Sequence, residues 1–133
     1  MNQTHKKRIL LVDDDPSLVE LFTMVLEFEG YQVMVAGDGE EAVNIIDHPQ
    51  GEGWSFDIIM VDLMLPVMDG LHFMHCLRHE MNCPLPVLVL SGMSKPAEIE
   101  RALAEGADAV LSKPVEPMLV IQKLDALLDV ANA

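Results

Sequence analysis

Residues 57–70 read Asp-Ile-Ile-Met-Val-Asp-Leu-Met-Leu-Pro-Val-Met-Asp-Gly, which contains the clearest succession of strand and turn in the chain. Its apolar run at 58–61 suits a strand that is buried on both faces, as the strands of parallel sheets are. Pro66 and the Asp-Gly pair at 69–70 then indicate an ordered turn before a helical pattern begins. We therefore expect Asp62 at the carboxyl end of a central parallel strand, where open α/β sheets place their functional groups.

The rest of the chain repeats this alternation of strand and helix. Further strands are expected at 9–12, 31–36, 84–90 and 109–111. Helices are expected at 16–28, 40–47, 71–80, 95–105 and 118–130, and residues 48–55 are the most loop-like. Asp15 and Pro16 suit the start of the first helix, and Gly30 suits its end. Short βα connections of this kind favour a doubly wound α/β domain, a parallel sheet with helices on both faces.

Length and charge narrow the class of protein. The 133 residues, half of them hydrophobic, can bury one continuous core, and we expect a single domain at 8–131 without an output domain. Residues 1–7 form a polar tail without a signal-peptide core, and no apolar run is long enough for a bilayer, so we expect a cytoplasmic protein without a membrane partner. The formal net charge of −14 argues against direct nucleic-acid binding. Cys76 and Cys83 lack a CxxC spacing and are expected to be free thiols.

Polar residues follow the apolar strands and form the candidate site: Asp13, Asp14, Asp62, Ser91 and Lys113. Carboxylates gathered at one sheet edge repel each other unless a cation lies among them, and all-oxygen ligands favour Mg²⁺ over zinc. The lysine and the serine suit a phosphoryl group, and a carboxylate can accept one as an aspartyl phosphate. Each residue alone has an ordinary interpretation, such as a helix cap or a solvated lysine. Their joint order along the chain is what favours a site.

Four motifs together resemble the receiver domain of two-component response regulators: Val12-Asp13-Asp14-Asp15-Pro16, Asp62 with Pro66 and Met68-Asp69-Gly70, Ser91-Gly92, and Lys113-Pro114. The resemblance runs from about residue 8 to residue 128. It implies a flavodoxin-like (βα)5 fold with a five-stranded parallel sheet of order 2-1-3-4-5. The strands at 31–36 and 109–111 would then lie at the sheet edges.

The resemblance also implies a role for each acidic residue. Asp62 would be the phosphoacceptor and would take a phosphoryl group from a histidine kinase or a histidine phosphotransfer protein. Asp14 and Asp62 would ligate Mg²⁺ through their side chains, with Asp13 helping through water. Met64 would contribute only its backbone carbonyl. Such a domain catalyses its own phosphorylation and dephosphorylation, without turnover of a separate substrate, and switches a protein–protein interaction surface.

The remaining implied roles concern the basic and hydroxyl groups. Lys113 would pair with Asp62 and then with the phosphoryl oxygens, and Ser91 would move in to hydrogen-bond the phosphate. The peptide between Lys113 and Pro114 would be cis. The downstream effector stays open.

The sequence departs from the family at two kinds of position. Val110 and Val115 stand where the family often has aromatic rings, so a constitutive interaction module that is never phosphorylated stays an alternative. Met64 and Met93, two residues beyond Asp62 and Ser91, cannot orient a water, and we predict a long-lived phosphoaspartate. An Asp-x-Asp phosphatase of the haloacid-dehalogenase type would leave residues 62–70 unexplained. A flavodoxin-type flavin site would place a phosphate beside three aspartates, which would repel it unless a metal ion is present.

Three helices carry further signals. His72, His75, Cys76 and His79 are expected to share one face, either as an ordinary polar face or as ligands of a soft metal. The helix at 16–28 is apolar around much of its circumference, which core packing or a docking surface for a helical phosphodonor would explain. The last helix is similarly apolar and could support a homodimer.

Overall fold

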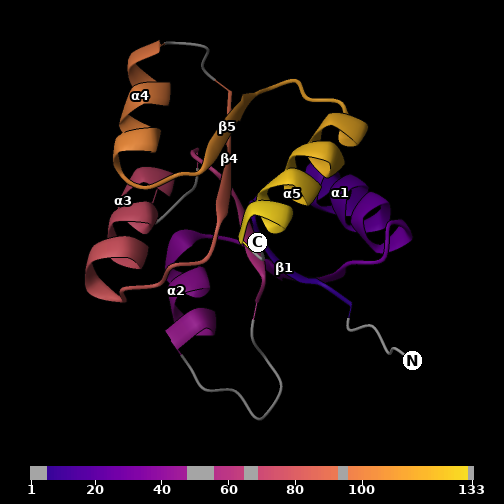
Figure 1. Cartoon of the computed structure of the whole chain (residues 1–133), viewed down its shortest axis with the longest axis horizontal. Coiled ribbons are helices and arrows are strands. Elements are labelled where there is room, and N and C mark those ends of the chain that lie inside the picture. The colour runs from indigo at the N-terminus through magenta and orange to yellow at the C-terminus, as the bar shows by residue number, and fades with distance from the viewer. Residues whose placement is uncertain (1–5, 48–55, 65–68, 93–95, 132–133) are drawn as a thin grey trace.

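The computed structural model describes residues 6–47, 56–64, 69–92 and 96–131, and the expected loop at 48–55, Pro66 and Met93 lie outside these ranges. A five-stranded parallel sheet of order β2-β1-β3-β4-β5 forms the centre of the molecule (Figure 1). Its strands are β1 (Arg8–Val12), β2 (Gln32–Ala36), β3 (Ile58–Asp62), β4 (Val87–Ser91) and β5 (Ala109–Ser112). The expected strand order is confirmed.

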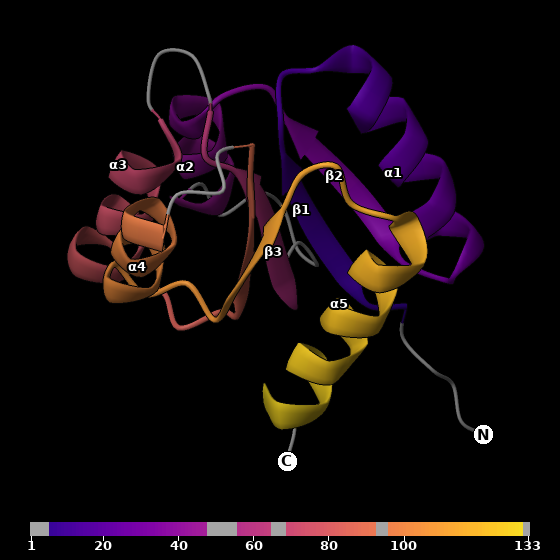
Figure 2. The same ribbon diagram turned by 90° about the horizontal axis from the view of Figure 1, so that it is seen from above.

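Helices cover both faces of the sheet, as a doubly wound fold requires. They are α1 (Pro16–Phe28), α2 (Gly39–Asp47), α3 (Gly70–His75), the π-helical segment η1 (Cys76–Glu80), α4 (Pro96–Ala104) and α5 (Pro117–Ala131). Figure 2 shows α1 and α5 on one side of the sheet and α2, α3 and α4 on the other. None of the helices in the described ranges is long and apolar enough to cross a bilayer.

The core lies in two layers because successive residues of each strand point to opposite faces. In β3, Ile59 and Val61 pack in the cluster that includes Phe73 of α3. Ile58 and Met60 pack in the opposite cluster, with Phe22 of α1. Every residue of β3 and β4 is buried, whereas β2 and β5 are partly exposed, as edge strands are.

The expected start of the first helix is confirmed. The Ser17 N–H donates to Asp15 Oδ1 at 3.0 Å, and Pro16 occupies the first turn. At the other end, Gly30 has a φ of +98°, a conformation that glycine adopts without strain. Core packing explains only part of the apolar surface of α1, because Phe22 and Leu26 are buried while Met24 and Phe28 are exposed.

Two expected boundaries are wrong. β4 begins at Val87, not at residue 84, because Pro84 and Pro86 have no N–H to donate to a neighbouring strand. The helix expected at 71–80 divides at Cys76 into α3 and the π-helical η1, where the Met81 N–H donates to the Cys76 carbonyl at 2.9 Å. An i→i+5 bond changes the angle between successive side chains, so α-helical spacing does not hold across this segment.

Candidate active site at the strand ends

Functional groups gather at the carboxyl edge of the sheet because parallel strands all end there. Asp13 follows β1, Asp62 ends β3 and Ser91 ends β4. These three are the buried polar or charged residues of the described ranges, at 2%, 4% and 1% exposure. Burying polar groups is unfavourable unless they find partners, so their position at this edge indicates a functional site.

Both carboxylate oxygens of Asp62 have partners. Lys113 Nζ donates to Asp62 Oδ2 at 2.5 Å, and the Met64 N–H donates to Asp62 Oδ1 at 2.9 Å. The Lys113 backbone N–H also donates to the Ser91 carbonyl at 2.7 Å, which holds the start of the lysine beside the end of β4. The peptide between Lys113 and Pro114 is cis, as the resemblance implied.

Three carboxylates meet beside this ion pair. One oxygen each from Asp13, Asp14 and Asp62 lies within 4.8 Å of the others. Asp13 Oδ1 accepts from the Asp15 N–H at 3.0 Å, whereas Asp13 Oδ2 is buried and has no hydrogen-bond partner among the described residues. Burial raises the pKa of the Asp13 carboxyl, and the neighbouring Asp62 charge adds to the effect. An unpartnered buried oxygen within an all-oxygen donor set fits a hard divalent cation such as Mg²⁺.

The structure thus brings together the acidic residues and the lysine that the sequence singled out. Met64 reaches Asp62 through its backbone N–H, and its side chain is 63% exposed. In the sequence, Gly70 belongs to an expected turn and to the Met68-Asp69-Gly70 motif, neither of which indicates how closely it packs. A Cβ atom at Gly70 would lie 2.6 Å from Leu63 Cα and 2.9 Å from the Asp62 carbonyl oxygen. Its lack of a side chain therefore allows α3 to begin directly against the end of β3.

A partly apolar cleft adjoins the lysine, between α1 and the segment that leads from β5 to α5. Its lining residues are Asp15, Leu18, Phe22, Leu90, Lys113, Pro114 and Val115. The cleft makes the surface next to the acidic cluster concave and mostly nonpolar.

The sequence profile of the response regulator receiver domain matches residues 9–125. The chain belongs to this family. The receiver domain is 36% identical over 123 residues to the response regulator GtcR of Aneurinibacillus migulanus. This alignment covers 92% of this chain and 48% of the relative. It is 34% identical over 125 residues to the DNA-binding response regulator MtrA of Mycolicibacterium smegmatis. This alignment covers 94% of this chain and 52% of the relative.

Solved structures agree with this assignment. A CheY-like response regulator receiver domain protein from Methanospirillum hungatei superimposes on the receiver domain with a TM-score of 0.83 and 30% identity, over 94% of this chain and 95% of that one. The chain spans about half the length of the curated relatives it matches. The family is that of two-component response regulators.

Proposed function

We propose that this receiver domain accepts a phosphoryl group on Asp62 from the phosphohistidine of a histidine kinase or a histidine phosphotransfer protein. The observation that carries the proposal is the buried Asp62 carboxylate at the end of β3, paired with Lys113 and adjoining two further carboxylates. A carboxylate oxygen of Asp62 would attack phosphorus. The P–N bond to the donor imidazole would break, and an acyl phosphate would form on Asp62.

The neighbouring residues have roles that follow from their positions. Lys113 holds a positive charge against Asp62 before transfer and would pair with phosphoryl oxygens afterwards. Ser91, buried at the end of β4, would donate its hydroxyl to the phosphoryl group. Ser91 ends β4 and Lys113 directly follows β5, so a phosphoryl group bound by both would be held across the ends of these two neighbouring strands.

The acidic cluster would hold Mg²⁺ for this reaction. Asp14 and Asp62 would ligate it directly and Asp13 through water, with the backbone carbonyl of Met64 as a further ligand. When bound, Mg²⁺ offsets the negative charge of the phosphoryl group. The unpartnered Asp13 Oδ2 supports this assignment, because a bound cation or its water would give that oxygen a partner.

The test is incubation with acetyl phosphate and Mg²⁺, followed by intact-mass measurement. We expect one added phosphoryl group that requires Mg²⁺ and is absent in Asp62→Ala, while the exposed Asp129→Ala is labelled like the wild type. Lys113→Met should be labelled more slowly. Labelling of Asp62→Ala that disappears in Asp13→Ala would instead indicate phosphatase-like chemistry.

A constitutive interaction module is the second candidate, and Val110 is the observation that favours it. This residue lies half-buried in β5 opposite Val89, at a position where the family often carries an aromatic ring. No labelling under conditions that label another receiver domain would support the module. Partner binding that is unchanged in Asp62→Ala would support it independently.

A further inference from the structure

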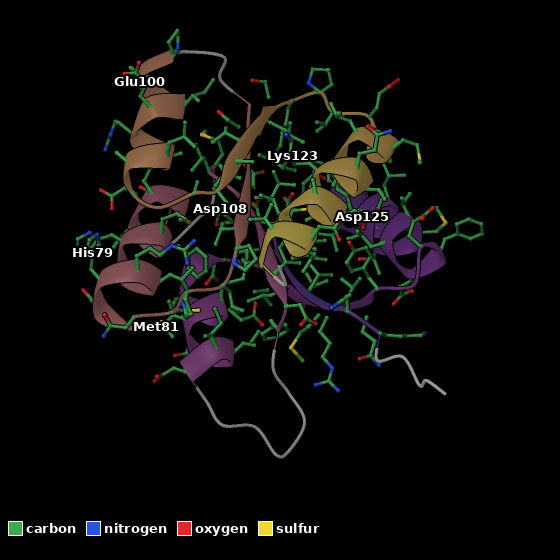
Figure 3. The ribbon with its side chains drawn as sticks, in the orientation of Figure 1. His79, Met81, Glu100, Asp108, Lys123 and Asp125 are labelled. Atoms are coloured by element: carbon green, nitrogen blue, oxygen red, sulfur yellow. The ribbon has the colours of Figure 1, made fainter. Side chains whose placement is uncertain are left out.

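A second group of ligand-type side chains lies outside the acidic pocket. His75 is the last residue of α3, His79 lies four residues later in η1, and Glu105 directly follows α4. Figure 3 shows His79 on the outer side of this helical layer, and Glu100 on the neighbouring helix α4. We propose that His75, His79 and Glu105 form a binding site for a divalent transition-metal ion of the Zn²⁺ class.

The three side chains converge on a common point. His75 Nδ1 lies 3.4 Å from Glu105 Oε1, and His79 Nε2 lies 4.0 Å from the same oxygen. The two imidazole rings are 4.6 Å apart at their centroids and tilted by 33°. One ligand atom from each residue lies within 4.8 Å of the other two. Both imidazoles are more than half exposed, yet the histidines of α3 and η1 converge on a carboxylate that comes from the end of another helix.

Glu105 supplies the observation that an exposed polar face does not explain. Its Oε1 is buried and has no hydrogen-bond partner among the described residues, although both histidines approach it. Burying a carboxylate oxygen without a hydrogen bond is unfavourable. A cation bound between the oxygen and the two rings would satisfy it. The carboxylate contributes the negative charge that two neutral imidazoles lack.

The spacing suits a small ion with tetrahedral coordination. Ligand atoms about 2.0–2.1 Å from zinc are about 3.3 Å apart across a tetrahedral angle. The separation between His75 Nδ1 and Glu105 Oε1 is already 3.4 Å. His79 Nε2 lies 4.0 Å from Glu105 Oε1 and must approach it by about 0.7 Å, which rotation of a 59% exposed side chain allows. Two imidazoles and one carboxylate favour Zn²⁺, Co²⁺ or Ni²⁺ over Mg²⁺, and water would complete the coordination.

Arg78 holds the segment that carries the two histidines close to the turn that carries Glu105. Its guanidinium donates to the Gly106 carbonyl at 2.8 Å from Nη2, and Nη2 also lies 3.1 Å from Asp108 Oδ2. These bonds tie η1 to the turn immediately after Glu105. Because Arg78 lies between His75 and His79 in the sequence, the same clamp holds both histidines near the carboxylate. The pairing with Asp108 also offsets the positive charge of Arg78 close to a bound cation.

The proposed site differs from the histidine face expected from the sequence. Cys76 does not belong to it, because the side chain is buried and burial raises the pKa of its thiol, with Glu80 adding to the effect. His72 is exposed but does not join the group. Glu105, which sequence reasoning did not include, provides the third ligand. The site lies at the carboxyl ends of α3 and α4, at the sheet edge opposite the acidic pocket.

The experiment titrates tag-free protein of residues 1–133 with Co²⁺ and Zn²⁺ in excess Mg²⁺, so that the acidic pocket does not compete. Co²⁺ binding is followed by its visible absorption, and Zn²⁺ binding by calorimetry. We expect one equivalent to bind. His75→Ala, His79→Ala and Glu105→Gln should each weaken binding at least tenfold, since each removes a ligand. His72→Ala, on the same helix outside the group, and Asp13→Asn, in the acidic pocket, should bind like the wild type.

Three outcomes would overturn the proposal: no saturable binding at millimolar metal, binding that survives in His75→Ala and His79→Ala, or loss of binding in Asp13→Asn with the histidine variants unaffected. Absence of saturable binding would mean that these residues form a simple His–Glu ion pair and no metal site. Urea denaturation without metal checks that each variant is folded, since a folded variant should unfold cooperatively. The added stability from Zn²⁺ should appear in the wild type and His72→Ala but not in His79→Ala.

Discussion

Arg78 lies directly against Gly106, and each residue restricts the other. Arg78 Nη2 and Nε donate to the Gly106 carbonyl at 2.8 and 3.2 Å. A Cβ atom on Gly106 would lie 2.7 Å from Arg78 Cγ, closer than carbon atoms approach without a clash. Gly106 also has a φ of +111°, which residues with a Cβ rarely adopt. The turn after α4 is therefore built around a glycine and one partly buried arginine.

Gly106→Ala tests this relationship, and Gly30→Ala is its matched control. Both glycines have positive φ, but a Cβ at Gly30 would meet nothing within 4 Å. We expect Gly30→Ala to lower the free energy of unfolding by roughly 1 kcal/mol and Gly106→Ala by roughly 3 kcal/mol, because only the second displaces Arg78. Urea denaturation measures both. Equal losses would show that backbone strain alone accounts for the effect.

The general architecture could be predicted because its signals are local. Apolar runs bounded by turn residues predict the positions of the strands. An Asp or Ser at the end of such a run can then be located without knowing how the elements pack. Parallel strands bring those ends to one edge, so Asp13, Asp62 and Ser91 follow from the order of elements alone. The first strand and the cap at Asp15 agree with the structure for the same reason.

Features that depend on contacts across elements escaped prediction. Arg78 is separated by 28 residues from Gly106, and nothing in its sequence neighbours indicates that it bonds three backbone carbonyls, those of Gly106, Cys83 and Leu85. Glu105 is the last residue of the helix expected at 95–105, which has an ordinary amphipathic pattern, so its approach to His75 appears only after α4 packs beside α3. The π-helical turn at Cys76 likewise has no sequence signal that we could read.

Gly70→Ala should damage the site and the fold together. The new methyl group would overlap backbone atoms of Leu63 and Asp62, which cannot rotate aside as a side chain can. We expect a loss of roughly 2–3 kcal/mol in unfolding free energy and slower labelling by acetyl phosphate. Gly37→Ala is the control, because its Cβ would make an ordinary 3.5 Å contact with Glu41 Oε1. Unchanged labelling of Gly70→Ala would show that the start of α3 can shift without moving Asp62.

Asp13→Asn should stabilise the metal-free protein, by about 1 kcal/mol at neutral pH. The ionised Asp13 is buried beside Asp62, and its pKa is raised by burial first. A raised folded-state pKa means that the folded protein binds more protons, so wild-type stability falls as the pH rises through that pKa. The difference in unfolding free energy that favours Asp13→Asn should therefore become smaller at acidic pH. Denaturation in EDTA at pH 7 and near pH 4 measures it.

Mg²⁺ should reverse the ranking of these two proteins. A cation that binds only the folded state stabilises the wild type, and Asp13→Asn should gain less because one carboxylate is lost. The comparison is made at pH 7 with and without Mg²⁺. A larger gain from Mg²⁺ in Asp13→Asn than in the wild type would contradict the assignment of Asp13 to the cation site.

Met64 should prolong the life of the phosphoaspartate. Its side chain is 63% exposed, two residues beyond Asp62, and a thioether cannot orient an attacking water. We expect Met64→Asn, which supplies a polar group there, to shorten the half-life of phosphorylated Asp62 by roughly tenfold, since an oriented water reacts faster. Met64→Leu, which keeps an apolar chain, should leave it unchanged. The decay of the phosphorylated mass in Mg²⁺ buffer measures all three, and a wild-type half-life of seconds would contradict the prediction.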